Sequence, residues 1–347
     1  MLPNTIDITS DIQQSLRGFL DATTFSQLAV LVDENTKEHC LPLIQPVLPD
    51  STLIIEIKSG EEHKNFGTCQ HIWEQMTSAA FDRKALFINL GGGVIGDMGG
   101  FCAATYKRGI RFLNLPTTLL AQVDASVGGK LGVDFGPYKN HIGLFKEPES
   151  VLVFTDFTKT LPSQEIRSGY AEIIKHCLIR DQHYWLEIQK HALEQQDWKA
   201  HVAHSIGVKY AVVQEDPTEK GLRKILNFGH TIGHAVESHF LNHDQGRLLH
   251  GEAVAIGMIA ETYLSAEQGY ISKENLAEIV NYTLKIYDKV DLSNENFNVI
   301  AKHALQDKKN DTGKIKASLL LAVGDCGFDI EITTEEIISA LKYYQTL

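Results

Sequence analysis

Short apolar runs alternate with helical periodicity through the first half of the chain. Five such runs, rich in Val, Ile, Leu and Phe, are predicted strands: Gln27–Val32, Thr52–Ile57, Ala85–Leu90, Ile110–Leu115 and Val151–Phe154. Helical patterns lie between most of them, such as Cys69–Ala80 and Val94–Ala104. Strand–helix alternation of this kind favours a doubly wound sheet of mostly parallel strands.

The pattern changes after Leu161-Pro162, where strands nearly vanish. Helical spacing of apolar residues predicts five helices: Gln164–Ile179, His201–Val213, Ile225–His239, Glu252–Ala266 and Lys273–Ile286. One apolar run, Ala317–Val323, interrupts this pattern, and Thr334–Tyr344 is a predicted final helix. We therefore predict an α/β domain over residues 1–160 and an all-α domain over residues 161–347, with the active site in the cleft between them.

Composition and charge narrow the function. The 347 residues correspond to about two domains at roughly 150 residues each. An apolar fraction of 43% and a charged fraction of 22% are typical of globular proteins and exclude a disordered chain. The net charge of −12 argues against a nucleic-acid partner. An acidic enzyme can still bind an anionic substrate where its basic side chains converge.

The cysteines and the apolar runs indicate the compartment. The five cysteines are widely spaced and form no C-x-x-C pair: Cys40, Cys69, Cys102, Cys177 and Cys326. They are predicted to be reduced thiols. The N-terminal segment has no signal-peptide pattern, and no apolar run approaches the ~20 residues that span a bilayer. We expect a cytoplasmic protein without membrane association.

A glycine-rich turn follows the third predicted strand. Gly91-Gly92-Gly93-Val94-Ile95-Gly96 satisfies G-x-G-x-x-G, a pattern that lets the backbone approach a pyrophosphate at the positive end of a helix. The usual dinucleotide turn instead follows the first strand and has an acidic residue about 20 residues later, which is missing here. Asp97 directly after the turn is also unusual. A nucleotide-binding turn and a plain strand-to-helix turn are both open readings.

A second glycine cluster, Gly128-Gly129-Lys130, does not satisfy the P-loop pattern. Asp124 takes the place of the first glycine, and Leu131 takes the place of the Ser or Thr that would hold magnesium. Lys130 and the nearby Lys139-Asn140 are still candidates for binding an anion.

Two histidines have a spacing that suits a metal ion. His230 and His234 lie one turn apart on one face of a predicted helix. The pattern alone is weak evidence, because the chain has 15 histidines and His239/His243 repeats it. His250-Gly251-Glu252 adds a polar group at the start of another helix.

Glu172 and Lys175 share one face of the predicted helix Gln164–Ile179. One carboxylate and two imidazoles with an open position form a catalytic zinc site, whereas structural zinc would need more cysteines. A buried salt bridge between Glu172 and Lys175 is the alternative reading.

Several basic residues lie in glycine-rich or apolar stretches: Arg108, Lys130, Lys139, Lys175, Lys209, Arg223, Lys308 and Lys309. Each alone is explained by a solvated surface charge. An unpaired buried cation is costly, however, so an anionic ligand would account for them.

Taken in order, these motifs resemble the 3-dehydroquinate synthase family of the sugar-phosphate cyclase superfamily. The matching segments run from about Asp33 to Asn310: Ser59–Lys64, Gly91–Asp97, Thr105–Gly109, Pro116–Lys130, Lys139-Asn140, Tyr170–His176, Asn227–Glu237, His250–Val254 and Asp307–Asn310. The resemblance implies an N-terminal Rossmann-like NAD-binding domain, an all-α metal- and substrate-binding domain, and a homodimer.

The resemblance also assigns roles to residues. The metal, zinc or cobalt, is expected on Glu172, His230 and His250, so His234 is expected beside the reacting centre and not as a ligand. NAD contacts are expected at Asp33, Ser59, Gly60, Glu61, Lys64, Gly92, Gly93, Val94, Ile95, Gly96, Asp97, Thr117, Thr118, Lys130, Lys139, Phe157 and Thr160. Substrate contacts are expected at Asp124, Lys130, Asn140, Lys175, Lys209, Arg223, Asn227, His234 and Lys308 or Lys309, and from Arg108 of the neighbouring subunit. The expected catalytic residues are Lys130, Lys175, Lys209, Arg223, Asn227 and His234.

The family's reaction converts 3-deoxy-D-arabino-heptulosonate 7-phosphate into 3-dehydroquinate and phosphate, within the shikimate pathway to aromatic amino acids. It combines transient oxidation by NAD, phosphate elimination, re-reduction, ring opening and aldol closure. A related cyclase for another sugar phosphate, a metal-dependent polyol dehydrogenase and a non-catalytic binding protein are the rival readings. The synthase is favoured because its substrate-site pattern is matched at Lys209, Asp216, Glu219, Arg223, Asn227 and Asp307–Asn310.

Overall fold

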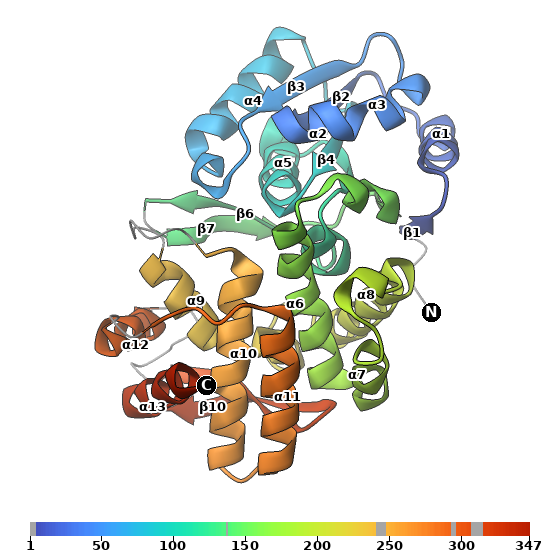
Figure 1. Ribbon diagram of the computed structural model, residues 1–347. Helices are drawn as coiled ribbons and strands as arrows, with labels where there is room; N and C mark the ends of the chain where they lie inside the picture. Colours follow the sequence, from blue (N-terminus) through green and yellow to red (C-terminus); the bar gives the residue numbers. More distant parts are fainter. Residues whose placement is uncertain (1–4, 137, 241–247, 293–295, 307–314) are drawn as a thin grey trace. The chain divides into compact units, whose positions relative to one another are not determined.

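The computed structural model describes residues 5–136, 138–240, 248–292, 296–306 and 315–347 (Figure 1). The chain forms two compact units. Unit 1 comprises Met1–Pro162 and Trp198–Tyr210, and unit 2 comprises Ser163–Asp197 and Ala211–Leu347.

Unit 1 contains a six-stranded sheet in which every pairing is parallel. Its strands, in spatial order, are β1 (Ile6–Thr9), β8 (Ser150–Phe154), β5 (Arg111–Pro116), β4 (Leu86–Gly91), β2 (Leu28–Asp33) and β3 (Leu53–Ile57). The five predicted strands are confirmed to within a residue or two at each end. The short edge strand β1 was not predicted, because its four residues pair only with β8 and are not deeply buried.

Helices cover both faces of this sheet, as an all-parallel sheet requires. Alternate strand residues point to opposite faces: Leu31 packs in a cluster with α4 (Phe66–Ser78) and α5 (Gly93–Thr105), and Val30 packs in a cluster with α1 (Ile12–Ala22) and α3 (Leu41–Ile44). The helix α2 (Glu34–His39) follows β2 directly. This arrangement confirms the doubly wound α/β prediction.

An antiparallel hairpin of β6 (Lys130–Phe135) and β7 (Tyr138–Phe145) lies outside the main sheet and was not predicted. Leu131 and Val133 of β6 join the cluster beneath α5. Most of β7 is exposed, so it lacks the apolar alternation by which a strand is recognised in the sequence.

Unit 2 is helical, as predicted, with one added hairpin. Its helices are α6 (Ser163–Arg180), α7 (Gln182–Ile188), α9 (His230–Phe240), α10 (His250–Glu267), α11 (Lys273–Ile286), α12 (Phe297–Gln306) and α13 (Thr334–Thr346); α8 (Trp198–Glu215) begins in unit 1 and ends in unit 2. The apolar run after residue 314 is the strand β9 (Ile315–Ala322), which pairs with β10 (Asp325–Ile332). No helix among the described residues is long and apolar enough to cross a membrane.

The predicted helix Ile225–His239 is wrong at its start. Leu222–Asn227 forms a 3₁₀ helix, and α9 begins only at His230. Gly229 between them has a φ of +79°, a left-handed conformation that interrupts an α-helix and that glycine adopts without strain.

Candidate active site

Three helices of unit 2 bring Glu172, His230 and His250 together. Glu172 lies within α6, and each histidine is the first residue of its helix, α9 or α10. The Oε1 atom of Glu172 is 3.4 Å from Nε2 of His230 and 3.7 Å from Nε2 of His250. Glu172 is 1% exposed and His230 is 9% exposed, whereas the His250 side chain is 29% exposed, so the cluster is in contact with water at His250.

These separations suit a shared metal ion. Two ligands that lie about 2.0–2.1 Å from a tetrahedral zinc ion are roughly 3.3 Å from each other, close to the observed spacings. The outward ring nitrogens also have acceptors: Nδ1 of His230 is 3.1 Å from the Phe228 carbonyl, and Nδ1 of His250 is 3.5 Å from Oε2 of Glu237. Such contacts orient metal-binding imidazoles. The residues present therefore fit a divalent ion.

The charges of two of these groups already suit a metal. Burial raises the pKa of Glu172, but attraction to the Lys175 ammonium, together with the contacts with His230 and His250, outweighs burial and leaves this pKa well below its usual value. Burial, together with Lys175, lowers the pKa of His230 to about 3. At neutral pH Glu172 is thus an anion and His230 is a neutral imidazole, which are the forms that bind metals.

His250 differs in its protonation. Burial lowers its pKa, but the contacts with the carboxylates of Glu172 and Glu237 outweigh burial and raise the pKa to about 9. Metal binding at His250 therefore displaces a proton at neutral pH.

Lys175 forms an ion pair with Oε2 of Glu172, three residues earlier on α6, and both side chains are almost fully buried. The salt bridge that the sequence offered as an alternative to a metal role is thus present. It does not exclude that role, because the other carboxylate oxygen faces the two histidines.

His234 lies in the same cluster, as its spacing predicted. Each of His230, His234 and His250 places one ring nitrogen within 4.8 Å of those of the other two. Spacing therefore admits His234 as a ligand, and its assignment to the reacting centre stays a prediction.

A loop before α9 positions two further candidate residues. The Asp216 carboxylate accepts hydrogen bonds from the backbone N–H groups of Gly221, Lys220 and Arg223 at 2.7–3.1 Å. Arg223 is 1% exposed and donates to the Pro217 carbonyl, 2.6 Å away. Nδ2 of Asn227 donates to Oε1 of Glu219 at 2.8 Å.

The glycine-rich turn of unit 1 lies where the strand order reverses. β3 lies on one side of β2, and β4, the next strand along the chain, lies on the other side. In open α/β sheets ligands bind at such a switch point, beside the carboxyl ends of the strands. Gly91 ends β4 and Asp33 ends β2 at this edge. The first and third predicted strands, β2 and β4, both flank this switch point, so a turn after the third predicted strand lies at it.

Thr118 packs closely against this turn. A Cβ at Gly92 would lie 2.9 Å from Cγ2 of Thr118. Asp33 caps α2, because its Oδ1 accepts from the Thr36 N–H at 2.7 Å. Gly92, Thr118 and Asp33 are all expected NAD contacts.

Lys64, Asp97 and Asn140 are brought together as well. Nζ of Lys64 lies 2.7 Å from Oδ2 of Asp97 and 2.6 Å from Oδ1 of Asn140. Burial raises the pKa of Asp97, and the neighbouring Lys64 ammonium opposes that rise.

Two of the basic residues expected to need an anionic ligand, Lys175 and Lys209, are already paired within the protein. Lys209 lies 2.7 Å from Oδ2 of Asp124, and Lys175 pairs with Glu172. These pairs compensate the buried charge within the protein, so burial alone does not require an anionic ligand.

The remaining candidates have varied surroundings. Arg108, Lys130 and Thr160 are exposed; Arg108 has a φ of +72°, and Lys130 is the first residue of β6. The Ser59 hydroxyl donates a hydrogen bond to Glu34. Phe157 lies in the core beside Phe154. Lys308 and Lys309 lie outside the described residues.

Sequence reasoning gave no role to Glu237. This carboxylate on α9 is 6% exposed and lies against His250. Its position seven residues after His230, two turns along one helix face, was the available signal.

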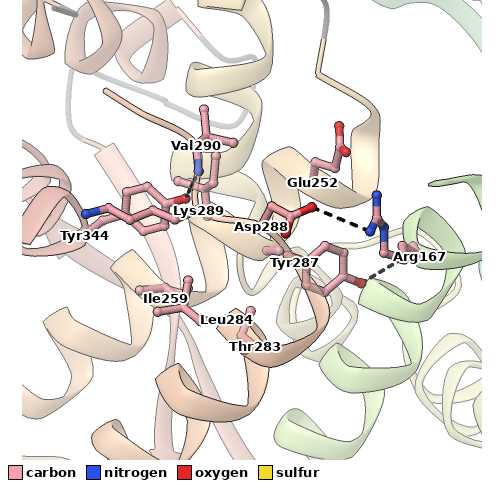
Figure 2. Close-up of a pocket in the computed structure, with 12 residues that line it drawn as sticks. Arg167, Glu252, Ile259, Thr283, Leu284, Tyr287, Asp288, Lys289, Val290 and Tyr344 are labelled. Atoms are coloured by element: carbon pink, nitrogen blue, oxygen red, sulfur yellow. Dashed lines mark hydrogen bonds and ion pairs between the residues drawn. The ribbon is translucent and has the colours of Figure 1, made fainter. Parts of the chain in front are cut away.

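A cavity of about 110 Å³ lies beside α10 but is lined by none of the three candidate ligands (Figure 2). Arg167 and Asp288 form a loose ion pair at 3.7 Å on its wall, and Tyr287 donates to the Arg167 carbonyl. The volume is below the roughly 300 Å³ of small-molecule sites. Glu252 on its wall accepts from the Leu249 N–H at 2.8 Å, which fixes the first turn of α10 and so His250.

The fold is shared with solved sugar-phosphate cyclases and with a glycerol dehydrogenase. The chain superimposes on a 2-epi-5-epi-valiolone synthase from Streptomyces hygroscopicus with NAD⁺ and Zn²⁺ bound, with a TM-score of 0.89 and 24% identity over 100% of this chain and 98% of that one. A glycerol dehydrogenase from Schizosaccharomyces pombe gives a TM-score of 0.70 and 14% identity over 100% and 90%.

Sequence comparison is more specific. The family models for the 3-dehydroquinate synthase N-terminal and C-terminal domains match residues 54–168 and 169–310. A 3-dehydroquinate synthase from Parabacteroides distasonis is 39% identical over 99% of both chains, and one from Leptospira interrogans is 42% identical over 83% of this chain and 80% of that one. The chain belongs to the 3-dehydroquinate synthase family.

Proposed function

We propose that this chain converts 3-deoxy-D-arabino-heptulosonate 7-phosphate into 3-dehydroquinate and phosphate. The observation that carries the proposal is the buried Glu172 carboxylate facing His230 and His250, in a chain that the family models match from residue 54 to residue 310. The reaction is a carbon–oxygen lyase reaction with transient oxidation, phosphate elimination, re-reduction, ring opening and aldol closure.

Glu172, His230 and His250 would hold a divalent ion, zinc or cobalt, and the glycine-rich turn with Asp33, Lys64, Asp97 and Thr118 would hold NAD. When bound, the ion supplies a Lewis acid for a ring hydroxyl, and NAD supplies a reversible hydride acceptor. The switch point of the sheet supports the assignment of NAD to unit 1.

The substrate carries a carboxylate and a phosphate, and basic residues are assigned to bind them. Lys175 and Arg223 are pre-positioned by Glu172 and by the Asp216 loop, so they lose little freedom on binding. Holding one substrate conformer can supply about 7–11 kcal/mol of the barrier reduction. The substrate's own phosphate can accept the proton in the elimination, so no dedicated general base is assigned. The other proposed substrate contacts are Asn227, His234, Lys209, Lys130, Asp124, Asn140 and either Lys308 or Lys309.

The organisation of the enzyme is part of the proposal. Residues 1–160 form the NAD-binding domain and residues 161–347 the metal- and substrate-binding domain. Arg108 acts on the phosphate of a neighbouring subunit in a homodimer. The five buried free cysteines support a cytoplasmic enzyme of the shikimate pathway.

The test is phosphate release from the heptulosonate phosphate, measured with and without NAD while absorbance at the NADH band is followed. We expect NAD-dependent phosphate release without net NADH. Accumulating NADH would indicate the polyol dehydrogenase instead. Faster turnover of sedoheptulose 7-phosphate would indicate another cyclase, and no turnover at all would favour a binding protein.

A further inference from the structure

The residue before α9, the helix that carries His230, has no side chain with which to cap it. Gly229 has a φ of +79°, and a Cβ there would lie 2.5 Å from Cγ of Met258. Only glycine fits this position. The first N–H groups of a helix need acceptors, and the residue before the helix usually provides one from its side chain. Gly229 has no side chain to do so.

A carboxylate from another helix takes this role. Oε2 of Glu261 accepts the Gly229 N–H at 2.5 Å, and Oε1 accepts the Ile232 N–H at 2.9 Å. These are the two N–H groups that a capping box satisfies within one chain segment. Glu261 is fully buried, and both of its carboxyl oxygens face the start of α9.

Glu261 belongs to α10, whose first residue is His250. The two helices touch through their backbones: a Cβ at Gly257 would overlap the Gly229 carbonyl oxygen, and one at Gly233 would lie 2.9 Å from the Ala253 carbonyl oxygen. Glu261 therefore connects the start of one histidine-bearing helix to the body of the other.

We propose that Glu261 is a positioning residue for the metal centre. It fixes the first turn of α9 on α10, and so holds His230 in register with His250. A metal site needs its ligands within about 0.5 Å of the productive geometry, which a loosened first turn would not maintain. The inference rests on the proposed metal centre.

The test compares Glu261→Gln, Glu261→Asp and a control, Ser265→Ala, as metal-free full-length proteins. Ser265 is also fully buried on α10, and its hydroxyl donates to the Glu261 carbonyl and accepts from the Leu320 N–H, so these two hydrogen bonds are to α10 and β9 and not to α9. Competition with a chromophoric chelator measures Co²⁺ and Zn²⁺ affinity, and thermal unfolding is followed in parallel. We expect Glu261→Gln to lower metal affinity about 10–100-fold, the range typical of lost supporting contacts, and Glu261→Asp to lie between it and the parent protein.

Ser265→Ala is expected to lower thermal stability and leave metal affinity unchanged. Unchanged affinity in Glu261→Gln overturns the inference, as does an equal loss in Ser265→Ala, because that would reflect stability alone. If Glu261→Gln does not fold, the metal affinity of Glu261→Asp tests the inference, and an affinity equal to that of the parent protein overturns it. A parent protein that binds no metal overturns the metal centre itself, a distinct outcome.

Discussion

Glu172 keeps its negative charge although it is almost completely buried. Burial of a carboxylate raises its pKa unless opposite charges compensate. Lys175 supplies that charge at one oxygen, and the other oxygen faces His230 and His250. The charge of Glu172 is thus compensated at one carboxylate oxygen, and the other oxygen faces the two histidines, where a metal ion would bind.

Glu237 orients His250, so its removal should weaken metal binding. We expect Glu237→Gln to lower metal affinity about 10–100-fold, because the amide attracts the His250 ring less strongly. Calorimetric titration of the metal-free protein checks this. Glu278→Gln is the control, since Glu278 accepts from Trp185, a residue outside the histidine cluster. Equal losses in both variants would contradict the assignment.

Arg223 is assigned to the substrate and not to NAD. Arg223→Ala should weaken substrate binding about 10–100-fold, the effect of losing a charged hydrogen bond, and change NAD binding little. Separate titrations of the two ligands measure this. Lys224→Ala is the neighbouring control, because Lys224 pairs with Asp329. Similar losses for substrate and NAD in Arg223→Ala would remove Arg223 from the substrate site.

At the scale of elements, close helix contact depends on glycine. Gly257→Ala places a methyl against the Gly229 carbonyl and should destabilise the protein by about 1–3 kcal/mol. Gly18 lies on the exposed face of α1, where an added Cβ would meet no non-neighbouring atom within 4 Å, so Gly18→Ala should stabilise the protein by about 0.5–1 kcal/mol. Denaturant unfolding measures both. A Gly257→Ala protein as stable as the parent would contradict the packing described for α9 and α10.

Elements with strong periodicity could be predicted from the sequence. Buried parallel strands such as β4 are continuous apolar runs, and α11 has the same bounds, Lys273–Ile286, as its periodicity indicated. The hairpin of β6 and β7 could not be found because most of β7 is exposed. The kink at Gly229 depends on contact with α10, which is distant in sequence.

The candidate site could be predicted only in part. Spacing selected His230 and His234, which share a helix. The sequence also singled out Glu172 and His250, but it could not show that they join these histidines, because their helices meet α9 only in the fold. Their assignment as metal ligands came from the family resemblance. Glu237 and Glu261 make contacts between α9 and α10. The spacing of Glu237 from His230 was a signal for the first residue, whereas no motif marks the second.

At the scale of the whole molecule, an acidic protein is proposed to bind a substrate with two anionic groups, a carboxylate and a phosphate. The net charge of −12 repels anions at long range, so binding depends on local cations such as Lys175 and Arg223. Their partners and burial hold them in place before the substrate arrives.

Removal of the metal should stop catalysis without unfolding the chain. The helices that carry the histidines pack in a large apolar cluster, which does not depend on an ion. Treatment with a chelator should therefore abolish phosphate release and preserve the far-ultraviolet circular dichroism, and added zinc or cobalt should restore activity. Activity indifferent to the chelator would contradict the metal requirement.

The most direct test is an anomalous difference map from crystals loaded with zinc, recorded at the zinc absorption edge. The account predicts one peak about 2.0–2.2 Å from a carboxylate oxygen of Glu172 and from a ring nitrogen of His230 and of His250. A peak coordinated without Glu172, or no peak among these three side chains, would contradict it.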